Sequence, residues 1–213
     1  MTTHAKALLA AASALLALAA RPAAAGEIAI EAQAGYFGMA ASNSASAVFG
    51  STGGGTFGGA ARYTFWRGAF FSAGVRTFSK DGERVFVATA NSPVQKLGFP
   101  LSVKITPILV QAGYRFRNGH LLVPYASVGV SITSYKEESE VAGEAFNTDI
   151  TKTGFAGAFG LEVGRGHFRF GAEVGFSSVP SALGLGGVSK VYGDDDLGGT
   201  YVIGKLIVAF GGK

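Results

Sequence analysis

Strict alternation of apolar side chains with small or polar ones is the feature of this sequence that most restricts its fold. It is clearest from Phe168 to Phe176, where every second residue is apolar and Arg, Gly or Glu stands between. Successive side chains of a β-strand point to opposite faces, so this pattern indicates strands with one apolar face. Similar patterns predict strands at about 28–36, 57–65, 71–76, 108–116, 122–132, 154–163, 168–176 and 202–210.

The predicted strands are joined by short and long connections in turn. The short ones are Arg67-Gly68, Arg117-Asn118-Gly119 and Arg165-Gly166, where glycine supplies the positive φ of a tight turn. The long ones, at 38–55, 79–102, 136–150 and 178–199, are rich in Gly, Ser and charge. Short turns at one end and long loops at the other are the layout of outer-membrane barrels. A turn at Arg165-Gly166 also places Glu162 directly opposite Arg169, which predicts an ion pair between the two strands.

The N-terminus has the composition of a secretory signal peptide. Lys6 precedes an apolar run at 7–20, and Ala23-Ala24-Ala25 are small residues of the kind a signal peptidase accepts. We therefore expect a signal peptide at 1–25 and one barrel domain at 26–213. A membrane anchor is the weaker interpretation, because the run is shorter than the ~20 residues of a spanning helix.

Composition excludes several classes of protein. The chain has no cysteine, which rules out a disulfide framework, a cysteine zinc site and a thiol nucleophile. No basic block suggests nucleic acid as a partner. Charged residues make up 15% of the chain, below the ~25% of soluble domains. Since lipid offers no partner for free backbone groups, a spanning chain without an apolar helix must close into a barrel.

We therefore predict an all-β fold, an antiparallel up-and-down transmembrane β-barrel of about eight strands. The polar face consists mainly of Gly, Ala and Ser, which suits the narrow lumen of such a barrel. Aromatic residues near predicted strand ends, including Tyr63, Trp66, Phe70 and Tyr201, agree with interfacial girdles. A soluble exported β-barrel that binds a ligand in its interior is the alternative.

Two segments resemble a known family. The run Tyr114-Arg115-Phe116, followed by Asn118-Gly119 and then Pro124-Tyr125, is similar to a hairpin of the outer-membrane β-barrel family that includes OmpW-like, opacity-type and OmpA transmembrane domains. The last predicted strand, which ends in Phe210, resembles the assembly signal of that family. The resemblance covers the chain after residue 25. It implies an outer-membrane location, outer-membrane lipid and lipopolysaccharide as surroundings, and the barrel-assembly machinery as a partner during biogenesis.

Charged residues on the small-residue face are predicted to lie in the lumen. This lumen charge network consists of Glu31, Arg62, Arg76, Arg115, Glu162, Arg169, Glu173 and Lys205. Buried charges must pair, because an isolated one is costly. We therefore expect a structural network that plugs the barrel and fixes its register, and a polar conduit or gate is the alternative.

Other candidate sites are weak. Asp194, Asp195 and Asp196 form an acidic run in the last long loop, but their spacing matches no ordered calcium loop, so a solvated loop is the preferred interpretation. No cofactor is predicted. An enzyme that modifies outer-membrane lipid would hold a histidine near the outer rim, and the sequence predicts none there. We therefore expect no enzymatic activity.

The sequence favours a structural or surface-interaction role. Long loops are frequent binding surfaces, so they are the expected site for any extracellular ligand. The alternative is a narrow channel for ions or small solutes, as in OmpW-like proteins. A lipid-modifying enzyme and a soluble ligand binder are the weaker alternatives.

Overall fold

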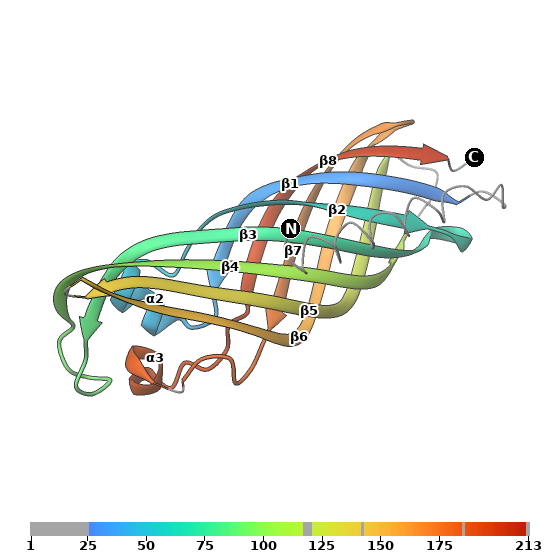
Figure 1. Cartoon of the computed structure of the whole chain (residues 1–213). Coiled ribbons are helices and arrows are strands. Elements are labelled where there is room, and N and C mark those ends of the chain that lie inside the picture. The colour runs from blue at the N-terminus through green and yellow to red at the C-terminus, as the bar shows by residue number, and fades with distance from the viewer. Residues whose placement is uncertain (1–25, 117–120, 142, 185, 212–213) are drawn as a thin grey trace.

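The fold is a closed barrel of antiparallel strands. The computed structural model describes residues 26–116, 121–141, 143–184 and 186–211. Each strand pairs with the next, and the last pairs with the first, which confirms the predicted up-and-down barrel (Figure 1). The eight strands are β1 (Glu27–Met39), β2 (Gly53–Thr64), β3 (Ala69–Phe86), β4 (Gln95–Arg115), β5 (Leu122–Val141), β6 (Glu144–Arg165), β7 (Phe168–Ser178) and β8 (Gly199–Gly211).

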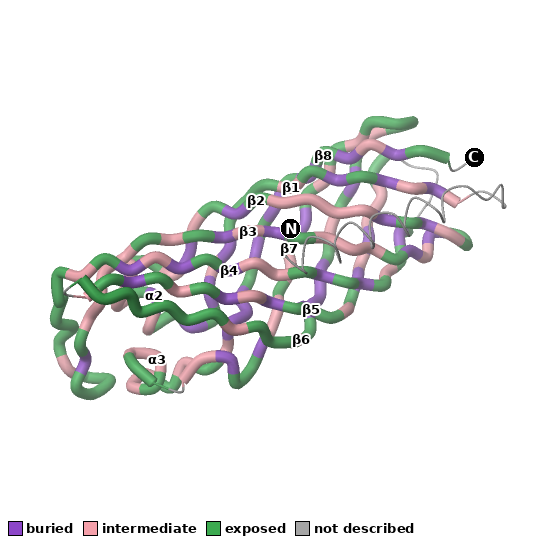
Figure 2. The backbone as a smooth tube through the Cα atoms, viewed as in Figure 1, coloured by how far each residue is buried: buried purple, intermediate pink, exposed green. Residues whose placement is uncertain are grey.

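The two faces of each strand are those predicted from the alternation. In β8 the side chains of Tyr201, Ile203 and Lys205 are buried in the lumen, whereas Val202 and Leu206 are exposed on the outside. Buried and exposed positions alternate in the same way along most of the other strands, whereas residues 144–153 of β6 are exposed on both faces except at Ile150 (Figure 2). The outward side chains form an apolar band around the barrel, as a lipid-facing surface requires.

The polarity of the two faces inverts towards one end of the barrel. In β4 the outward residues Ile108 and Val110 are apolar, but the outward residue Lys104 is charged and exposed. The inward residues Leu101 and Val103 at that end are apolar and buried. In β5 the outer face likewise becomes polar, at Lys136 and Glu138, and the inward Tyr135 is buried. We call the part beyond it, residues 79–86, 95–105, 134–141 and 144–154 of β3 to β6, the extension.

Two of the four predicted long loops are mostly strand. Residues 79–86 and 95–102 continue β3 and β4, and residues 136–141 and 144–150 continue β5 and β6. The prediction was wrong because the outer face becomes polar here, and in β4 apolar residues move to the inner face, which interrupts the alternation seen in the rest of each strand. These four strands are therefore 18 to 22 residues long, not the 9–11 residues expected for a bilayer crossing.

The other two long loops contain short helices that lie at the same end as the extension (Figure 1). They are α2 (Ser42–Phe49), which follows β1, and α3 (Gly187–Tyr192), which precedes β8. α2 contacts β3 and α3. We call the two helices and their flanking loops, residues 40–52, 179–184 and 186–198, the outer cap.

The register between β6 and β7 differs from the prediction by two residues. Arg165 pairs with Phe168, so Gly166 and His167 form the turn, and Glu162 lies opposite Gly171, not opposite Arg169. A two-residue shift keeps every side chain on the same face, so the alternation alone could not distinguish the two registers. The Arg67-Gly68 turn is confirmed by positive φ at both residues. The predicted turn at 117–119 and the predicted signal peptide at 1–25 lie outside the described residues.

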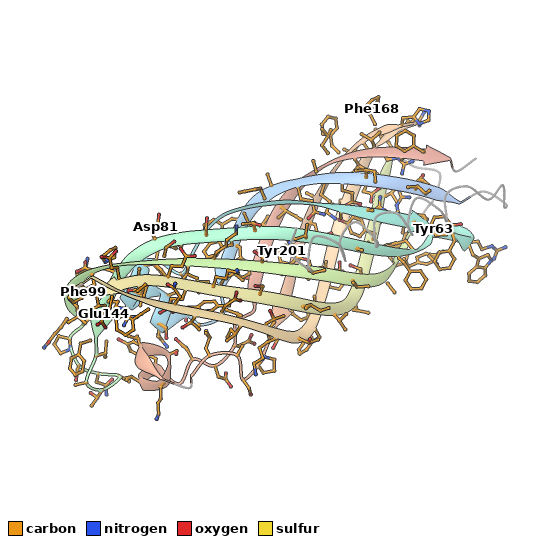
Figure 3. All side chains as sticks on the ribbon, viewed as in Figure 1. Tyr63, Asp81, Phe99, Glu144, Phe168 and Tyr201 are labelled. Carbon is orange, nitrogen blue, oxygen red and sulfur yellow. The ribbon has the colours of Figure 1, made fainter. Side chains whose placement is uncertain are left out.

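Two aromatic residues assigned to the interfacial girdles lie inside the barrel. Phe70 and Tyr201 are both 3% exposed and face the lumen. Tyr63 and Phe168 lie on the outside near the turns, at the end away from the extension (Figure 3). Within the described ranges, no helix has the length and hydropathy needed to cross a membrane.

Candidate functional site: a lumen with two layers

The half of the lumen near the turns holds a cluster of ion pairs. Arg115 on β4 crosses the lumen, and its Nη1 donates to Glu27 Oε1 at 2.7 Å while its Nη2 donates to Glu162 Oε2 at 2.6 Å. Arg169 on β7 donates to both carboxylate oxygens of Glu27, at 2.8 and 2.6 Å. Arg62 on β2 donates to Glu162 Oε1 and lies 3.1 Å from Glu31. The cluster thus ties together strands on opposite walls of the barrel.

A second group of charges continues this cluster along the lumen. Lys205 on β8 lies 3.0 Å from Glu31 and also donates to Glu173. The Tyr125 hydroxyl donates to Glu173 Oε2 at 2.7 Å. A Cβ at position 160 would stand 2.3 Å from the Tyr125 ring, so only glycine leaves room for that ring. We call Glu27, Glu31, Arg62, Arg115, Glu162, Arg169, Glu173 and Lys205 the charge network.

The charge network is balanced and buried. It contains four carboxylates and four cations, and the side chains of all but Arg169 are no more than 6% exposed. A charge moved out of water costs several kcal/mol unless a partner compensates it. Here each carboxylate contacts at least one cation, so none is left as a free general base. This arrangement suits mechanical cross-linking of the barrel wall.

The structure places all eight predicted lumen charges on the inner face, but it joins only seven of them in ion pairs. Arg76 on β3 has no carboxylate within 4.0 Å among the described residues, and its guanidinium lies 3.5 Å from the centre of the Tyr201 ring. Sequence reasoning missed Glu27 and Tyr125. Both could have been found from the alternation. Glu27 is four residues before Glu31 and therefore lies on the same face of the strand, and Tyr125 lies on the small-residue face of its strand.

The half of the lumen near the outer cap is filled by apolar side chains. Phe37 on β1 and Phe78 on β3 meet edge to face, with ring centres 5.2 Å apart. Residues of the outer cap, among them Ala45 and Leu197, pack into the same cluster. We call this cluster the apolar plug; its buried members are Phe37, Met39, Ala45, Phe78, Leu101, Val103, Ile105, Tyr135, Ala158, Val179, Ala182, Leu197, Tyr201 and Ile203.

The acidic run of the last long loop is held by hydrogen bonds to the protein. Asp194 Oδ2 accepts the backbone N–H of Ser44 at 2.8 Å and its hydroxyl at 2.7 Å, which joins α2 to the loop before β8. Asp196 accepts hydrogen bonds from the backbone N–H groups of Val179 and Gly198, both at 2.7 Å. These carboxylates therefore fasten the outer cap. No group of three or more metal-ligating side chains occurs among the residues that the structure describes.

Polar contacts join the extension to the outer cap and join its own strands to one another. Lys80 donates to the backbone carbonyl oxygens of Ser51 and Gly53, at 3.0 and 2.6 Å, and partial burial lowers the pKa of its ammonium group. Arg84 donates to the Ser139 hydroxyl at 2.6 Å and lies over the Phe146 ring. These contacts bind the extension to the outer cap and hold its strands together.

A family model described as an outer membrane protein β-barrel domain matches residues 8–179. No curated protein sequence matches the chain. Several solved structures share its fold.

Three of these structures illustrate the likeness. Ail, the attachment invasion locus protein of Yersinia pestis, solved with the heparin analogue sucrose octasulfate, has a TM-score of 0.52 at 15% identity, with 88% of this chain and 100% of that chain covered. OprG from Pseudomonas aeruginosa has a TM-score of 0.56 at 14% identity, with 88% and 97% covered. A major outer membrane protein from Thermus thermophilus has a TM-score of 0.61 at 10% identity, with 88% and 100% covered. At these identities the likeness is one of fold.

Proposed function

The chain belongs to the outer membrane protein β-barrel domain family, and from that premise we propose that it is a sealed, non-catalytic barrel with a structural and surface-interaction role. The observation that carries this proposal is the filling of the lumen at two levels. The charge network occupies one half, and the apolar plug occupies the other. A solute would have to break ion pairs in one layer and displace packed side chains in the other.

The extension is the surface we assign to interaction. Its outward side chains are polar, and β6 has an unpaired edge there, because β7 ends at Ser178, which pairs with Phe155. From Glu144 to Gly154 β6 therefore has only β5 as a strand neighbour among the described elements. An exposed strand edge offers backbone groups to an extended peptide. We place this edge outside the cell.

An acidic groove on the extension argues against a polyanionic ligand at that place. Asp81, Glu138 and Glu140 line a groove on its outer face. Such a groove repels sulfate groups, in contrast to the binding of sucrose octasulfate by Ail. We therefore expect no binding of sucrose octasulfate to this chain, measured by calorimetry with the protein in detergent.

Conductance in planar bilayers tests the sealed lumen against the competing role, a narrow channel. The wild-type protein should show no discrete openings. Glu162→Ala and Arg115→Ala each remove a partner from the charge network and should produce a leak. Lys104→Ala, on the outer face of the extension, is the matched control and should stay silent. Regular openings of the wild-type protein would establish the channel and refute the seal.

Surface labelling tests the position of the extension. Because the chain has no cysteine, a single Lys136→Cys or Val128→Cys substitution creates a unique label site. A membrane-impermeant maleimide added to intact cells should label position 136 on the extension and leave position 128 in the apolar band unmodified. Labelling of position 136 only after lysis would show that the extension faces the periplasm.

A further inference from the structure

Arg76 leaves one positive charge in the lumen uncompensated. The charge network holds four carboxylates and four cations, so Arg76 adds one surplus positive charge to this part of the lumen. Arg76 is 5% exposed and contacts the face of Tyr201 without an ion pair among the described residues. A buried cation without a counter-charge is costly, and an aromatic face offsets only part of that cost.

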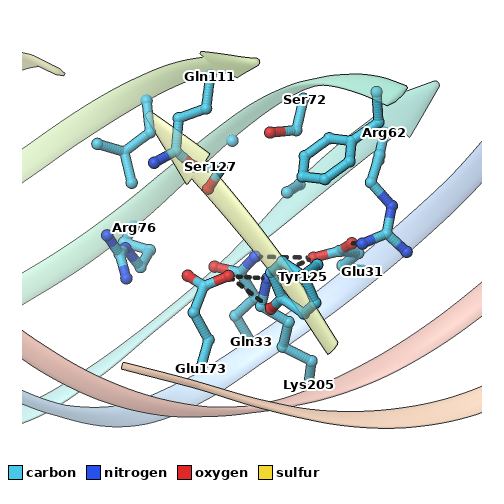
Figure 4. A pocket seen from close by; sticks show the side chains of 14 residues that line it. Glu31, Gln33, Arg62, Ser72, Arg76, Gln111, Tyr125, Ser127, Glu173 and Lys205 are labelled. Atoms are coloured by element: carbon cyan, nitrogen blue, oxygen red, sulfur yellow. Dashed lines mark hydrogen bonds and ion pairs between the residues drawn. The ribbon is translucent and has the colours of Figure 1, made fainter. Parts of the chain in front are cut away.

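The side chain of Arg76 enters a small cavity between the charge network and the apolar plug. The cavity is about 20 Å³ in volume, and its wall includes Arg76, Gln111, Ser72 and Ser127 (Figure 4). One water-sized occupant needs roughly 10–15 Å³. The charged residues of the wall are Glu31, Glu173, Arg62, Arg76 and Lys205, so the wall carries a net charge of +1.

Buried donors without partners surround this cavity. Arg76 Nη1 and Gln111 Nε2 are both buried without a hydrogen-bond acceptor among the described residues, and the Arg76 guanidinium lies on the ring of Tyr201. The Tyr201 ring is held there because residue 175 is glycine; a Cβ would stand 2.4 Å from it. Two N–H donors that lack acceptors, in a cavity with a surplus positive charge, call for an anionic acceptor.

We propose that this cavity binds one small monovalent anion of the halide class, such as chloride, between the guanidinium of Arg76 and the amide of Gln111. The anion neutralises the surplus charge and accepts the two unmade hydrogen bonds. The cavity volume, enough for one or two water-sized occupants, favours such an anion over phosphates and sugars.

Bromide provides a direct test, because it replaces chloride and scatters X-rays anomalously. Crystals of the full protein purified from outer membranes and grown in sodium bromide should show an anomalous peak beside Arg76. The peak should be absent in Arg76→Gln and present in Lys104→Gln, which removes an equal charge from the outer face of the extension. Ordinary water density at the site, without anomalous signal, would overturn the proposal.

Urea unfolding in detergent gives a second test in solution. An anion that binds only the folded state lowers the ratio of unfolded to folded protein by the factor 1 + [anion]/Kd, about elevenfold at ten times Kd. Wild type should therefore be more stable in chloride than in gluconate, which is too large for the cavity, at equal ionic strength. Arg76→Gln should lose this difference, and Lys104→Gln should keep it.

A second variant, which retains the Arg76 cation, keeps the proposal testable if Arg76→Gln does not fold. Gln111→Leu removes one donor at similar volume, so it should keep the heat-modifiable gel mobility of a folded barrel and show a smaller difference between chloride and gluconate. If Gln111→Leu and Lys104→Gln respond to chloride as wild type does, the anion does not occupy this cavity.

Discussion

Both halves of the barrel have a filled lumen, but one is filled by charged side chains and the other by apolar ones. Near the turns the inside is charged and the outside apolar. Towards the outer cap the lumen is filled by the apolar plug, and the outer face of the strands is polar. The side chains alternate with the same parity throughout, as Lys205 and Tyr201 on the inner face of β8 illustrate. What changes along the strand is the environment of the outer face, so the inversion marks where lipid gives way to water.

The largest effect is expected from breaking the charged half. Glu162→Ala removes the carboxylate shared by Arg62 and Arg115 and leaves buried positive charge, which should lower the free energy of unfolding by about 4 kcal/mol. Urea titration of the protein in detergent measures this. The exposed pair between Lys136 and Asp149 is the control, and Asp149→Asn should cost under about 1 kcal/mol. Equal losses in the two variants would mean that burial does not set the strength of the charge network.

A somewhat smaller effect is expected in the apolar half. Phe78→Ala leaves a cavity against Phe37 in the apolar plug and should lower stability by about 3 kcal/mol in the same titration. Phe86, near the tip of the extension, is 54% exposed, and Phe86→Ala should be nearly neutral. A neutral Phe78→Ala would show that the plug is loosely packed, which would favour the channel.

The boundary between the halves can be sharpened with lysine on the outer face. Val128→Lys places a charge in the apolar band of β5 and should cost about 2 kcal/mol, as charges do inside a bilayer. Ser134→Lys lies on the same face at the start of the extension and should cost close to nothing. Refolding into lipid vesicles, followed by urea titration, compares the two. Similar costs would move the boundary beyond residue 134.

The smallest effect is expected from loosening the outer cap. Asp194→Ala removes the acceptor of the two hydrogen bonds from Ser44 and should cost about 1 kcal/mol. Hydrogen exchange should accelerate in α2 and stay unchanged in β8. Asp195→Ala is the matched neighbour, because the Asp195 carboxylate accepts no hydrogen bond from the described residues. If both variants accelerate exchange equally, Asp194 does not fasten the cap.

The sequence predicted the barrel and the inner face because both depend only on period-two alternation. It mispredicted the β6–β7 register, since a two-residue shift leaves Glu162 and Arg169 on the same face. These residues still approach each other, at 3.9 Å across the pairing diagonal. It mistook the extension for loops because Leu101, Val103 and Ile105 are apolar on the face that is polar in the rest of β4.

The lumen charges were predicted as a set, but of their pairings only that of Glu162 with Arg169 was predicted. Pairing depends on the reach of long side chains across the barrel, which no spacing along the chain encodes. Arg115 contacts Glu27, which is 88 residues away in the sequence, and Arg76, with the same charge and face, contacts an aromatic ring. The outer cap could not be predicted from the sequence for the same reason, because α2 is held by Asp194, which lies in a loop 150 residues later.

Shared carboxylates restrict how this lumen can change in evolution. Glu162 forms ion pairs with arginines from two different strands, so replacing it by a neutral residue leaves a buried positive charge without a partner. Simultaneous loss of a cation and a carboxylate keeps the lumen neutral. Accepted changes should therefore occur as compensated pairs at positions distant in sequence, such as 27 and 115. Among relatives, the lumen should show strong covariation between strands, while each position of the outer apolar band drifts independently of its neighbours.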